Sequence, residues 1–323
     1  GEIERAVAAY REALALDPED RGGVAVRLAA LGRGEAPEAA PPAYVATLFD
    51  QTAERFDNIL VDQLGYAVPL MLAELLSRHG IRRAARLLDL GCGTGLAGES
   101  LAPLGAAATG VDLSEGMLAE ADARGGYEAL YVGEAAAFLE GWDGAPFDLI
   151  VATDMLPYLG AVERLFAGAA RCLAPGGHLA VSTETLPDAL FDGRGWTVGA
   201  GQRYAHSEGY LRAALAAAGF SVVAVEPVTV RHDGGRPVPG HLVLAGGAGG
   251  EAAGPRAPPL RGCGGGGRQA RPPMARGPAA LPSTGAADRA GASIMQGDSA
   301  CPVCRRARLV GATLGPDTPD AMR

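Results

Sequence analysis

The feature that most constrains this chain is residues 87–95, whose sequence is LLDLGCGTG. The leucines predict a short buried strand. The three glycines that follow predict a turn in which no Cβ atom separates a ligand from the backbone. A helix expected over residues 96–104 leaves its first N–H groups free to point at whatever the turn holds. A strand, a glycine turn and a helix in this order predict an α/β sheet with a ligand at its carboxyl edge.

An acidic residue, Asp112, ends the next apolar stretch, about 20 residues after the glycine turn. An acidic side chain at that distance accepts hydrogen bonds from both hydroxyl groups of a ribose. The residues therefore predict a cofactor that contains a nucleoside.

A second acid, Asp89, lies just before the glycines. The glycines follow a tight G-x-G-x-G pattern, whereas dinucleotide sites usually read G-x-G-x-x-G and hold a pyrophosphate. A carboxylate fixed at this place would repel a pyrophosphate and attract a sulfonium or an α-ammonium group. S-Adenosylmethionine carries both cations, so Asp89 favours it over NAD. A nicotinamide-dependent oxidoreductase is the alternative.

Strands and helices alternate between residues 86 and 245, which predicts a mostly parallel sheet with helices on both faces. We expect strands near residues 86–90, 107–112, 128–132, 147–152, 178–184, 221–230 and 241–245. We expect helices near residues 96–104, 115–123, 134–140, 161–173 and 207–218. A short turn at residues 233–237 joins the last two strands, and a connection of that length permits only an antiparallel pair.

Five ordered segments resemble the motifs of class I S-adenosylmethionine-dependent methyltransferases, over about residues 44–245. They are residues 89–95 (DLGCGTG), 110–114 (GVDLS), 131–135 (YVGEA), 147–154 (FDLIVATD) and 171–179 (RCLAPGGHL). The resemblance implies a Rossmann-like α/β fold with a seven-stranded, mostly parallel sheet and one antiparallel edge strand. It also implies transfer of a methyl group from S-adenosylmethionine to an acceptor, for which we expect a small molecule.

The same resemblance assigns residues to cofactor binding. The first segment would cradle the methionine part, Met117 would pack on the adenine, and Glu134 would accept from the adenine amino group where the family more often has Asp. The residues assigned to the cofactor are Asp89, Gly91, Cys92, Gly93, Thr94, Gly95, Asp112, Leu113, Met117, Glu134, Ala135, Thr153 and Asp154.

Residues that contact the acceptor should project from the carboxyl ends of the strands or from the helices over residues 43–78. The candidates are Tyr66, Tyr158, Arg203 and Tyr204. Phe49 and Phe56, with Tyr66, are candidates to close over the site, although packing against the sheet is an equally good interpretation.

His206 is the candidate general base, because the unperturbed pKa of histidine is near neutral. The alternative is that His206 packs beside a helix start that Ser207 caps. A base is required only when the acceptor has a proton to lose. The other histidines show no metal-ligand spacing, so we expect no metal.

The chain divides into four predicted parts. Residues 1–33 resemble part of a tetratricopeptide repeat, as in a bacterial subgroup of these methyltransferases, although an ordinary amphipathic helix is the alternative. Residues 34–42 are a predicted linker and residues 43–246 the methyltransferase domain. Residues 247–323 are rich in Gly, Pro, Ala and Arg, and we expect this tail to be disordered.

Charge and composition limit the partners. The chain has 28 basic and 37 acidic residues, a net charge of -9, and no basic block, which argues against nucleic-acid binding. No apolar run has the length of a membrane span. The five cysteines are few and irregularly placed, so we expect no disulfide framework and a location in the reducing cytoplasm. The alternatives to a small-molecule acceptor are a protein acceptor docked through the repeat, and a non-catalytic interaction protein that senses the cofactor.

Overall fold

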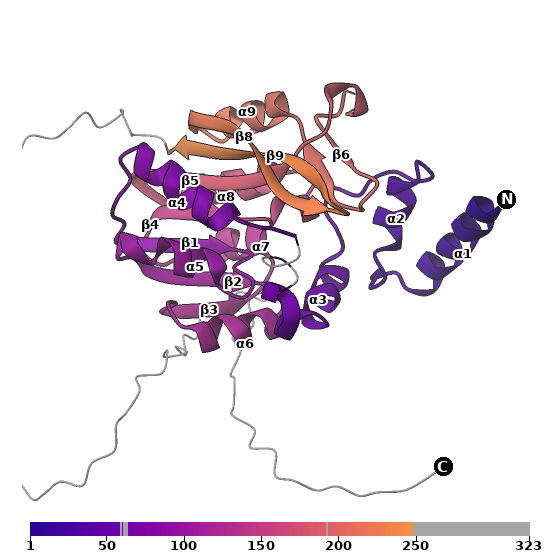
Figure 1. The fold of residues 1–323 in the computed structure, drawn as a ribbon, viewed down its shortest axis with the longest axis horizontal. Coiled ribbons are helices and arrows are strands. Elements are labelled where there is room, and N and C mark those ends of the chain that lie inside the picture. Colours follow the sequence, from indigo (N-terminus) through magenta and orange to yellow (C-terminus); the bar gives the residue numbers. More distant parts are fainter. Residues whose placement is uncertain (59, 61–63, 192, 248–323) are drawn as a thin grey trace, which may run out of the picture. The chain divides into compact units, whose positions relative to one another are not determined.

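The computed structural model describes residues 1–247, apart from residues 59, 61–63 and 192. Its centre is a sheet in which seven long strands lie in the order β3-β2-β1-β4-β5-β9-β8 (Figure 1). These strands are β1 (Arg86–Leu90), β2 (Ala107–Asp112), β3 (Ala129–Val132), β4 (Phe147–Ala152), β5 (Leu173–Glu184), β8 (Ser221–Asp233) and β9 (Arg236–Gly246). The tail that the sequence predicts to be disordered lies, from residue 248 on, outside the described residues.

Parallel pairing brings the carboxyl ends of the central strands to one edge of the sheet. Leu88 of β1 is in register with Thr109 of β2 on one side and with Ile150 of β4 on the other. Strands β3 and β5 extend the same parallel arrangement outward. The predicted mostly parallel sheet is confirmed, and residues that follow β1, β2, β4 and β5 gather at a single edge.

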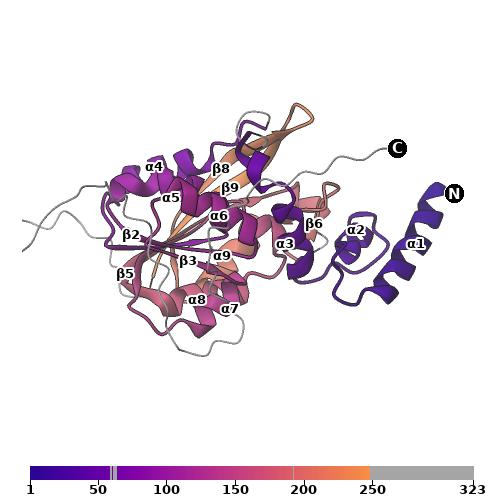
Figure 2. The same cartoon turned by 90° about the horizontal axis from the view of Figure 1, so that it is seen from below.

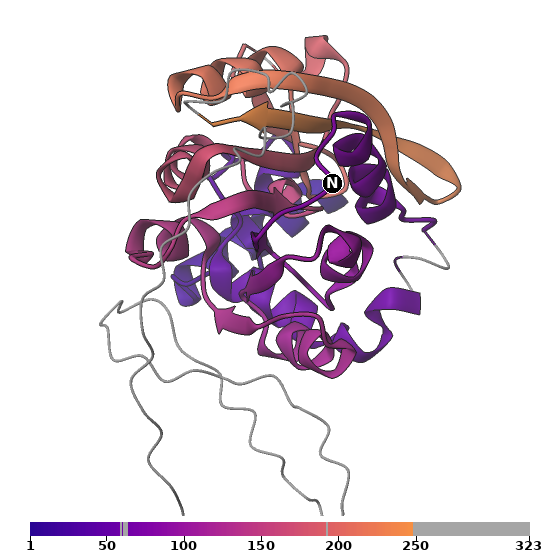
Figure 3. The same ribbon diagram turned by 90° about the vertical axis from the view of Figure 1, so that its left-hand side faces the viewer.

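The β8–β9 hairpin completes the sheet at the edge opposite β3 (Figure 3). Asp233 pairs with Arg236 across the tight turn, as the sequence predicts. Strand β9 is antiparallel to both β5 and β8. The antiparallel strand therefore lies one position in from the edge, and the expectation of an antiparallel edge strand is corrected.

Two further strands, β6 (Trp196–Val198) and β7 (Tyr204–His206), lie where the sequence predicts a loop. They pair antiparallel with each other, and Ala205 of β7 pairs with Glu184 at the end of β5. The sheet of the described residues thus has nine strands. Three residues are too few to show an alternating pattern, so these strands could not be distinguished from loop in the sequence.

Helices cover both faces of the sheet. Helices α4 (Val68–Arg78), α5 (Leu96–Leu101) and α6 (Glu115–Arg124) lie on one face, and α7 (Ala135–Gly141), α8 (Glu163–Cys172) and α9 (Glu208–Ala217) lie on the other (Figure 2). Successive side chains of a strand point to opposite faces. Leu87 accordingly belongs to the same buried cluster as Leu72 of α4, and Leu88 belongs to the same cluster as Phe166 of α8. Both faces are apolar, which fixes the register of the central strands.

The N-terminal segment forms helices α1 (Glu2–Leu16), α2 (Val24–Ala30) and α3 (Pro42–Asp50). The first two helices pack on each other through Val7, Val24 and Leu28. No helix among the described residues combines the length and the apolarity that a bilayer crossing requires.

The predicted linker is packed against the domain. Residues 37–40, here called the strap, pair with the segment that follows β4. The Ala40 N–H donates to the Tyr158 carbonyl at 2.9 Å, and the Gly160 N–H donates to the Glu38 carbonyl at 2.8 Å. The Tyr204 hydroxyl donates to the Pro37 carbonyl at 2.9 Å. The strap is therefore tied to the domain by backbone hydrogen bonds and is not a free connection.

Candidate functional site

A cavity of about 580 Å³ lies at the carboxyl edge of the sheet, within the size range of small-molecule sites. The glycine turn after β1 and the residues that follow β2 and β3 line one part of it. The residues after β4, helix α3 and the strap line another part. We call the first part, where the sequence predicts the cofactor, the cofactor half, and the second part, where it predicts the acceptor, the acceptor half. Both parts belong to one cavity.

The glycine turn has the open backbone that the sequence predicts. Gly91, Gly93 and Gly95 have φ values of +66°, +54° and +92°, in the left-handed region that favours glycine. A Cβ atom on Gly91 would lie 2.8 Å from Cγ of Met155, whereas one on Gly93 would meet no protein atom within 4 Å. Gly91, Gly93, Cys92 and Thr94 line the cavity, while Gly95 caps helix α5 outside its lining. The space over Gly93 is therefore open.

Asp112 ties the end of β2 to the glycine turn. Its Oδ2 accepts from the Gly93 N–H and its Oδ1 accepts from the Ser114 N–H, both at 2.9 Å. Burial raises the pKa of Asp112, and these backbone hydrogen bonds oppose the rise. Asp112, Leu113 and Met117 line the cavity together. The carboxylate is thus fixed in orientation and has lone pairs left for two hydroxyl groups, which fits the predicted ribose contact.

Asp89 lies below the glycine turn and does not line the cavity. It is fully buried, and the Tyr127 hydroxyl donates to its Oδ2 at 2.6 Å. Its Oδ1 has no hydrogen-bond partner among the described residues. Burial raises the pKa of Asp89 to about 7. This placement contradicts the expected contact between Asp89 and a sulfonium or ammonium group.

Glu134 lines the cavity beside Ala135 and also caps helix α7. Its two carboxylate oxygens accept from the N–H groups of Ala136 and Ala137 at 2.9 and 2.8 Å. The first role of this acid is therefore structural. Contact of Glu134 with an adenine amino group stays a prediction.

Aromatic side chains from the N-terminal half cover the cavity. Phe49, Phe56 and Tyr66 all line it, as the sequence predicts. The Phe49 ring meets the Phe56 ring edge to face at 5.6 Å and the Tyr158 ring at 5.3 Å. Such a cluster presents an apolar wall that suits a planar ligand.

Two aspartates hold this aromatic segment against the cofactor half. The Ser114 hydroxyl donates to Asp50 at 2.5 Å, and the Thr94 hydroxyl donates to Asp57 at 2.5 Å. Ser114 follows Asp112, and Thr94 belongs to the glycine turn. Direct hydrogen bonds thus link the segment that carries Phe49 and Phe56 to the glycine turn and to the residues after β2.

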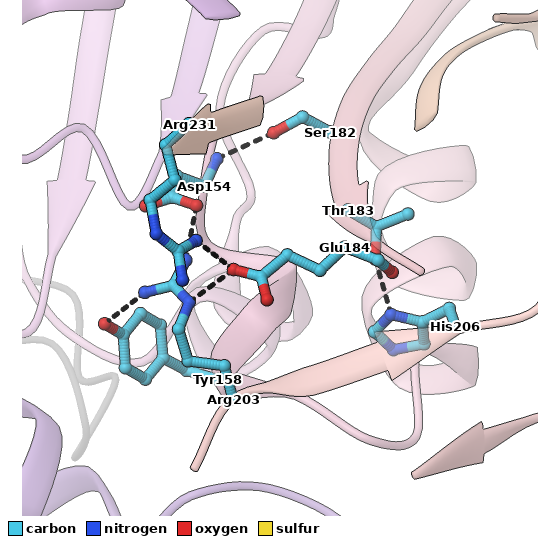
Figure 4. A network of polar contacts seen from close by, with 8 residues as sticks. All are labelled: Asp154, Tyr158, Ser182, Thr183, Glu184, Arg203, His206 and Arg231. Atoms are coloured by element: carbon cyan, nitrogen blue, oxygen red, sulfur yellow. Dashed lines mark hydrogen bonds and ion pairs between the residues drawn. The ribbon is translucent and has the colours of Figure 1, made fainter. Parts of the chain in front are cut away.

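A buried ion network lies at the ends of β4 and β5 (Figure 4). Arg203 donates to Asp154 and to Glu184, each at 2.5 Å, and to the Tyr158 hydroxyl at 2.7 Å. Arg231 donates to the same oxygen of Glu184. Two carboxylates therefore balance two guanidinium groups, as burial of charge requires.

Within this network the roles differ from those expected. Asp154, Thr153 and Tyr158 line the cavity, but Arg203 does not. Arg203 holds the side chains of Asp154 and Tyr158, and its planar group stacks 5.0 Å from the Tyr158 ring. The predicted direct contact of Arg203 with an acceptor is therefore corrected, because its guanidinium group is enclosed by the network and does not line the cavity. Burial raises the pKa of Asp154, and the nearby Arg203 and Arg231 oppose the rise.

His206 is buried away from the cavity lining. Its Nε2 donates to the Gly160 carbonyl at 3.1 Å, and its Nδ1 lies 2.6 Å from the Thr183 hydroxyl. Burial lowers the pKa of His206 to about 4. These contacts contradict the expected general base. The alternative interpretation fits, because Ser207 caps α9 beside it.

Tyr204 is likewise buried and does not line the cavity. Its hydroxyl supports the strap through Pro37, so the predicted acceptor contact is corrected.

The strap itself is the lining element that the sequence does not reveal. Glu38, Ala39 and Ala40 line the cavity, together with Met155 and Leu159. Residues 37–40 read PEAA and contain no β-branched or aromatic side chain that would predict strand pairing. Among the described residues, no cluster of three His, Cys, Asp or Glu side chains is arranged to hold a metal ion.

The chain is similar to known methyltransferases. A family model described as "Methyltransferase domain" matches residues 64–225, half of the chain. The ubiquinone biosynthesis O-methyltransferase of Xylella fastidiosa (strain 9a5c) is 38% identical over 121 residues, which are 36% of this chain and 49% of that protein. The protein of the same name from Maricaulis maris is 30% identical over 162 residues, 46% of this chain and 63% of that protein. The chain thus spans about half the length of the Xylella relative.

Solved structures show a similar fold. The 1,6-didemethyltoxoflavin-N1-methyltransferase of Burkholderia thailandensis, solved with 1,6-didemethyltoxoflavin and S-adenosylhomocysteine, aligns with a TM-score of 0.51 at 23% identity. The alignment covers 66% of this chain and 92% of that one. This likeness concerns the fold.

Proposed function

The chain belongs to the methyltransferase domain family, and on that basis we propose that it transfers a methyl group from S-adenosylmethionine to a small-molecule acceptor. One observation carries the proposal. A single cavity joins the glycine turn and Asp112 to the aromatic wall and Asp154. A donor and an acceptor held in that space would be aligned for displacement and shielded from water.

The residues present fit S-adenosylmethionine. The open backbone at Gly93 would receive the methionine part, and the fixed carboxylate of Asp112 would accept from the ribose hydroxyl groups. Met117 and Ala135 would border the adenine. The bound cofactor supplies an activated methyl group, and the chain aligns it and excludes water.

The acceptor half supports a small, largely apolar acceptor. Phe49, Phe56 and Leu60 line the cavity, and a volume of about 580 Å³ shared with a cofactor would leave room for a compact molecule only. The relatives from Xylella and Maricaulis are named for ubiquinone biosynthesis, and the Burkholderia structure holds 1,6-didemethyltoxoflavin. Both names are consistent with a small-molecule acceptor.

Calorimetric titration with S-adenosylmethionine and, separately, with NAD tests the proposal. We expect binding of the first and not of the second. Asp112→Ala should weaken binding about tenfold to 150-fold for each ribose hydrogen bond lost, since a charge-assisted bond contributes about 1.5–3 kcal/mol. The control is Asp143→Ala, which removes an exposed carboxylate outside the cavity. Tighter binding of NAD, or equal binding by both variants, would contradict the proposal.

We infer that helices α1 and α2 are part of a tetratricopeptide-like repeat, since they pack as a pair through Val7, Val24 and Leu28 and leave Ile3 and Leu16 exposed. A protein docked there is the alternative acceptor. We also propose that the chain is located in the cytoplasm. With tritium-labelled S-adenosylmethionine and a cell extract, label should enter small molecules, and label in protein would favour the alternative.

A further inference from the structure

We propose that Asp154 is the proton acceptor of the methyl-transfer reaction, that Arg203 positions it, and that the acceptor is an uncharged aromatic molecule with a hydroxyl group. The inference rests on the proposed function and names the substrate class of the same site. It replaces His206, whose two ring nitrogens are occupied away from the cavity.

Asp154 lies beside the turn that would hold the donor. It is the second residue after the end of β4. The next residue, Met155, packs against Gly91 so closely that a Cβ there would lie 2.8 Å from Met155 Cγ. Asp154 has a φ of +55°, which is uncommon for a residue other than glycine and is often found at active sites. Its N–H donates to the Ser182 hydroxyl at 2.8 Å, which fixes this backbone.

The carboxylate is held from one side and open on the other. Oδ1 accepts from Arg203 at 2.5 Å. The side-chain hydrogen bond to Asp154 from the described residues is to Oδ1, not to Oδ2, and Asp154 is among the residues that line the cavity. Arg203 is itself fixed by Glu184 and Tyr158 (Figure 4). A carboxylate oriented in this way presents a free oxygen to a ligand, as a general base must.

Other groups facing Asp154 are unsuited to accept the proton. Tyr66 and Tyr158 are neutral phenols, because burial raises the pKa of each. Glu184 is engaged by both Arg203 and Arg231. Among Tyr66, Tyr158, Glu184 and Asp154, Asp154 is therefore the carboxylate that both lines the cavity and keeps one oxygen without a donor among the described residues. Burial also makes this carboxylate a stronger base than an exposed aspartate.

The surroundings also define the acceptor. Phe49, Phe56 and Tyr158 form an aromatic wall. The two buried guanidinium groups of the network are already paired with carboxylates. The negative charge of Asp154 would repel a phosphate or carboxylate on the acceptor. Among the described residues of this network, no buried guanidinium group is left unpaired to neutralise such an anion. An uncharged aromatic ring would pack against this wall, and its hydroxyl group would donate its proton to Asp154.

The proton and electron balance is complete. The acceptor O–H bond breaks, and its proton passes to Oδ2 of Asp154. An oxygen electron pair forms the new O–CH3 bond while the carbon–sulfur bond of the donor breaks. That bond's electron pair stays on sulfur, which leaves S-adenosylhomocysteine. Asp154 then releases the proton to solvent.

The test uses 4-nitrocatechol, an uncharged aromatic probe whose visible absorption reports whether its hydroxyl group is ionised. The full chain is first loaded with S-adenosylhomocysteine, and loading is verified by calorimetry. The probe is then titrated in at a pH about one unit below the pKa of the free probe. We expect the bound probe to be ionised by the wild type. Asp154→Asn should lower the ratio of ionised to neutral bound probe about tenfold, the equivalent of one pKa unit.

The matched control is Glu163→Gln, which removes a cavity-lining carboxylate whose partner is the Tyr210 hydroxyl, outside the network. It should ionise the probe as the wild type does. Equal ionisation by wild type and Asp154→Asn, or equal loss in both variants, would overturn the assignment of Asp154. A loaded wild type that does not bind the probe would overturn the hydroxylated aromatic acceptor. Failure to load with S-adenosylhomocysteine would instead refute the proposed function.

Arg203→Gln provides a second measurement that does not depend on the Asp154 variant. Arg203 and Arg231 lower the pKa of Asp154, whereas Glu184 raises it, and Tyr66 and Tyr158 face it as neutral groups. Loss of Arg203 should therefore move the pH at which Asp154 takes up its own proton to a higher value. The acidic limb of probe ionisation should shift with it, and Arg203→Lys should restore part of the shift. An unchanged limb would mean that Arg203 is only structural, and would overturn its positioning role.

Discussion

Replacing Asp89 with asparagine should stabilise the folded protein increasingly as the pH rises. Asp89 is fully buried. Burial, with a smaller contribution from the charge of Asp112, raises its pKa to about 7, although the Tyr127 hydrogen bond opposes the rise. In the unfolded chain an aspartate titrates near pH 3.9. Between these two values the folded protein holds a proton on Asp89 that the unfolded chain has lost.

The sign and the size of the effect follow from this difference. Because the folded state binds more protons, the free energy of unfolding falls as the pH rises. The stabilising contribution of the protonated carboxyl is complete below about pH 4 and is lost as the pH rises through about 7. Each pH unit costs about 1.4 kcal/mol, and the whole window therefore costs about 4 kcal/mol. Asparagine avoids this cost. Its amide N–H at the place of the unpartnered Oδ1 adds a penalty of about 1–3 kcal/mol that does not depend on pH.

Urea unfolding of the wild type and of Asp89→Asn at several pH values between about 5 and 8 measures the effect. The difference in unfolding free energy should shift in favour of the variant by about 1.4 kcal/mol per pH unit up to about pH 7, and then level off. The constant asparagine penalty does not affect this slope. Asp143→Asn, at an exposed carboxylate, should run parallel to the wild type. A difference that does not change with pH would refute the account of Asp89.

Two further predictions concern the cofactor half. Glu134→Ala removes the acceptor for the Ala136 and Ala137 N–H groups and should cost about 0.5–2 kcal/mol in thermal unfolding; a variant that melts with the wild type would contradict the capping role. Gly91→Ala places a methyl group 2.8 Å from Met155 Cγ at a φ of +66° and should cost at least the roughly 1–2 kcal/mol of a left-handed residue. Adding Met155→Ala should recover the steric part of that loss, and no recovery would show that the backbone strain alone is responsible.

Much of the fold could be predicted from hydrophobic pattern. Leu87, Leu88 and Leu90 mark a buried strand, and the alternation of such strands with helices determines a parallel sheet. The short strands β6 and β7 could not be predicted, because they depend on one pairing, between Glu184 and Ala205, and not on their own sequence. The position of β9 inside the sheet is also a tertiary outcome, since the short turn predicts the hairpin but not which of its strands meets β5.

The site was predictable where backbone chemistry defines it. Gly91, Gly93 and Asp112 line the cavity because a tight turn and a strand end place them there. Asp89 lies outside the cavity lining, and the alternation of side chains along β1 explains why. As a neighbour of Leu88 and Leu90 in β1 it must point to the face opposite theirs, where Tyr127 lies in the apolar layer under α4 to α6. Strand alternation was the signal that could have placed it.

The acceptor half was less predictable because contacts between distant segments define it. Arg203 and His206 are polar residues in an expected loop, and their sequence positions do not show that one faces a network of carboxylates while the other is enclosed. The pairing of the strap with the segment after β4 joins residues more than a hundred positions apart, and no local pattern reports it.

The strap has a consequence for how proteins of this kind diversify. The wall at Glu38, Ala39 and Ala40 belongs to the chain that precedes the first strand, whereas the glycine turn and Asp112 belong to the sheet. Insertion, deletion or recombination upstream of α3 would therefore reshape the chamber for the acceptor and leave the nucleoside contacts unaltered. The residues proposed to select the acceptor and those proposed to bind the methyl donor can therefore change independently during evolution. A change of acceptor does not require a change in the sheet.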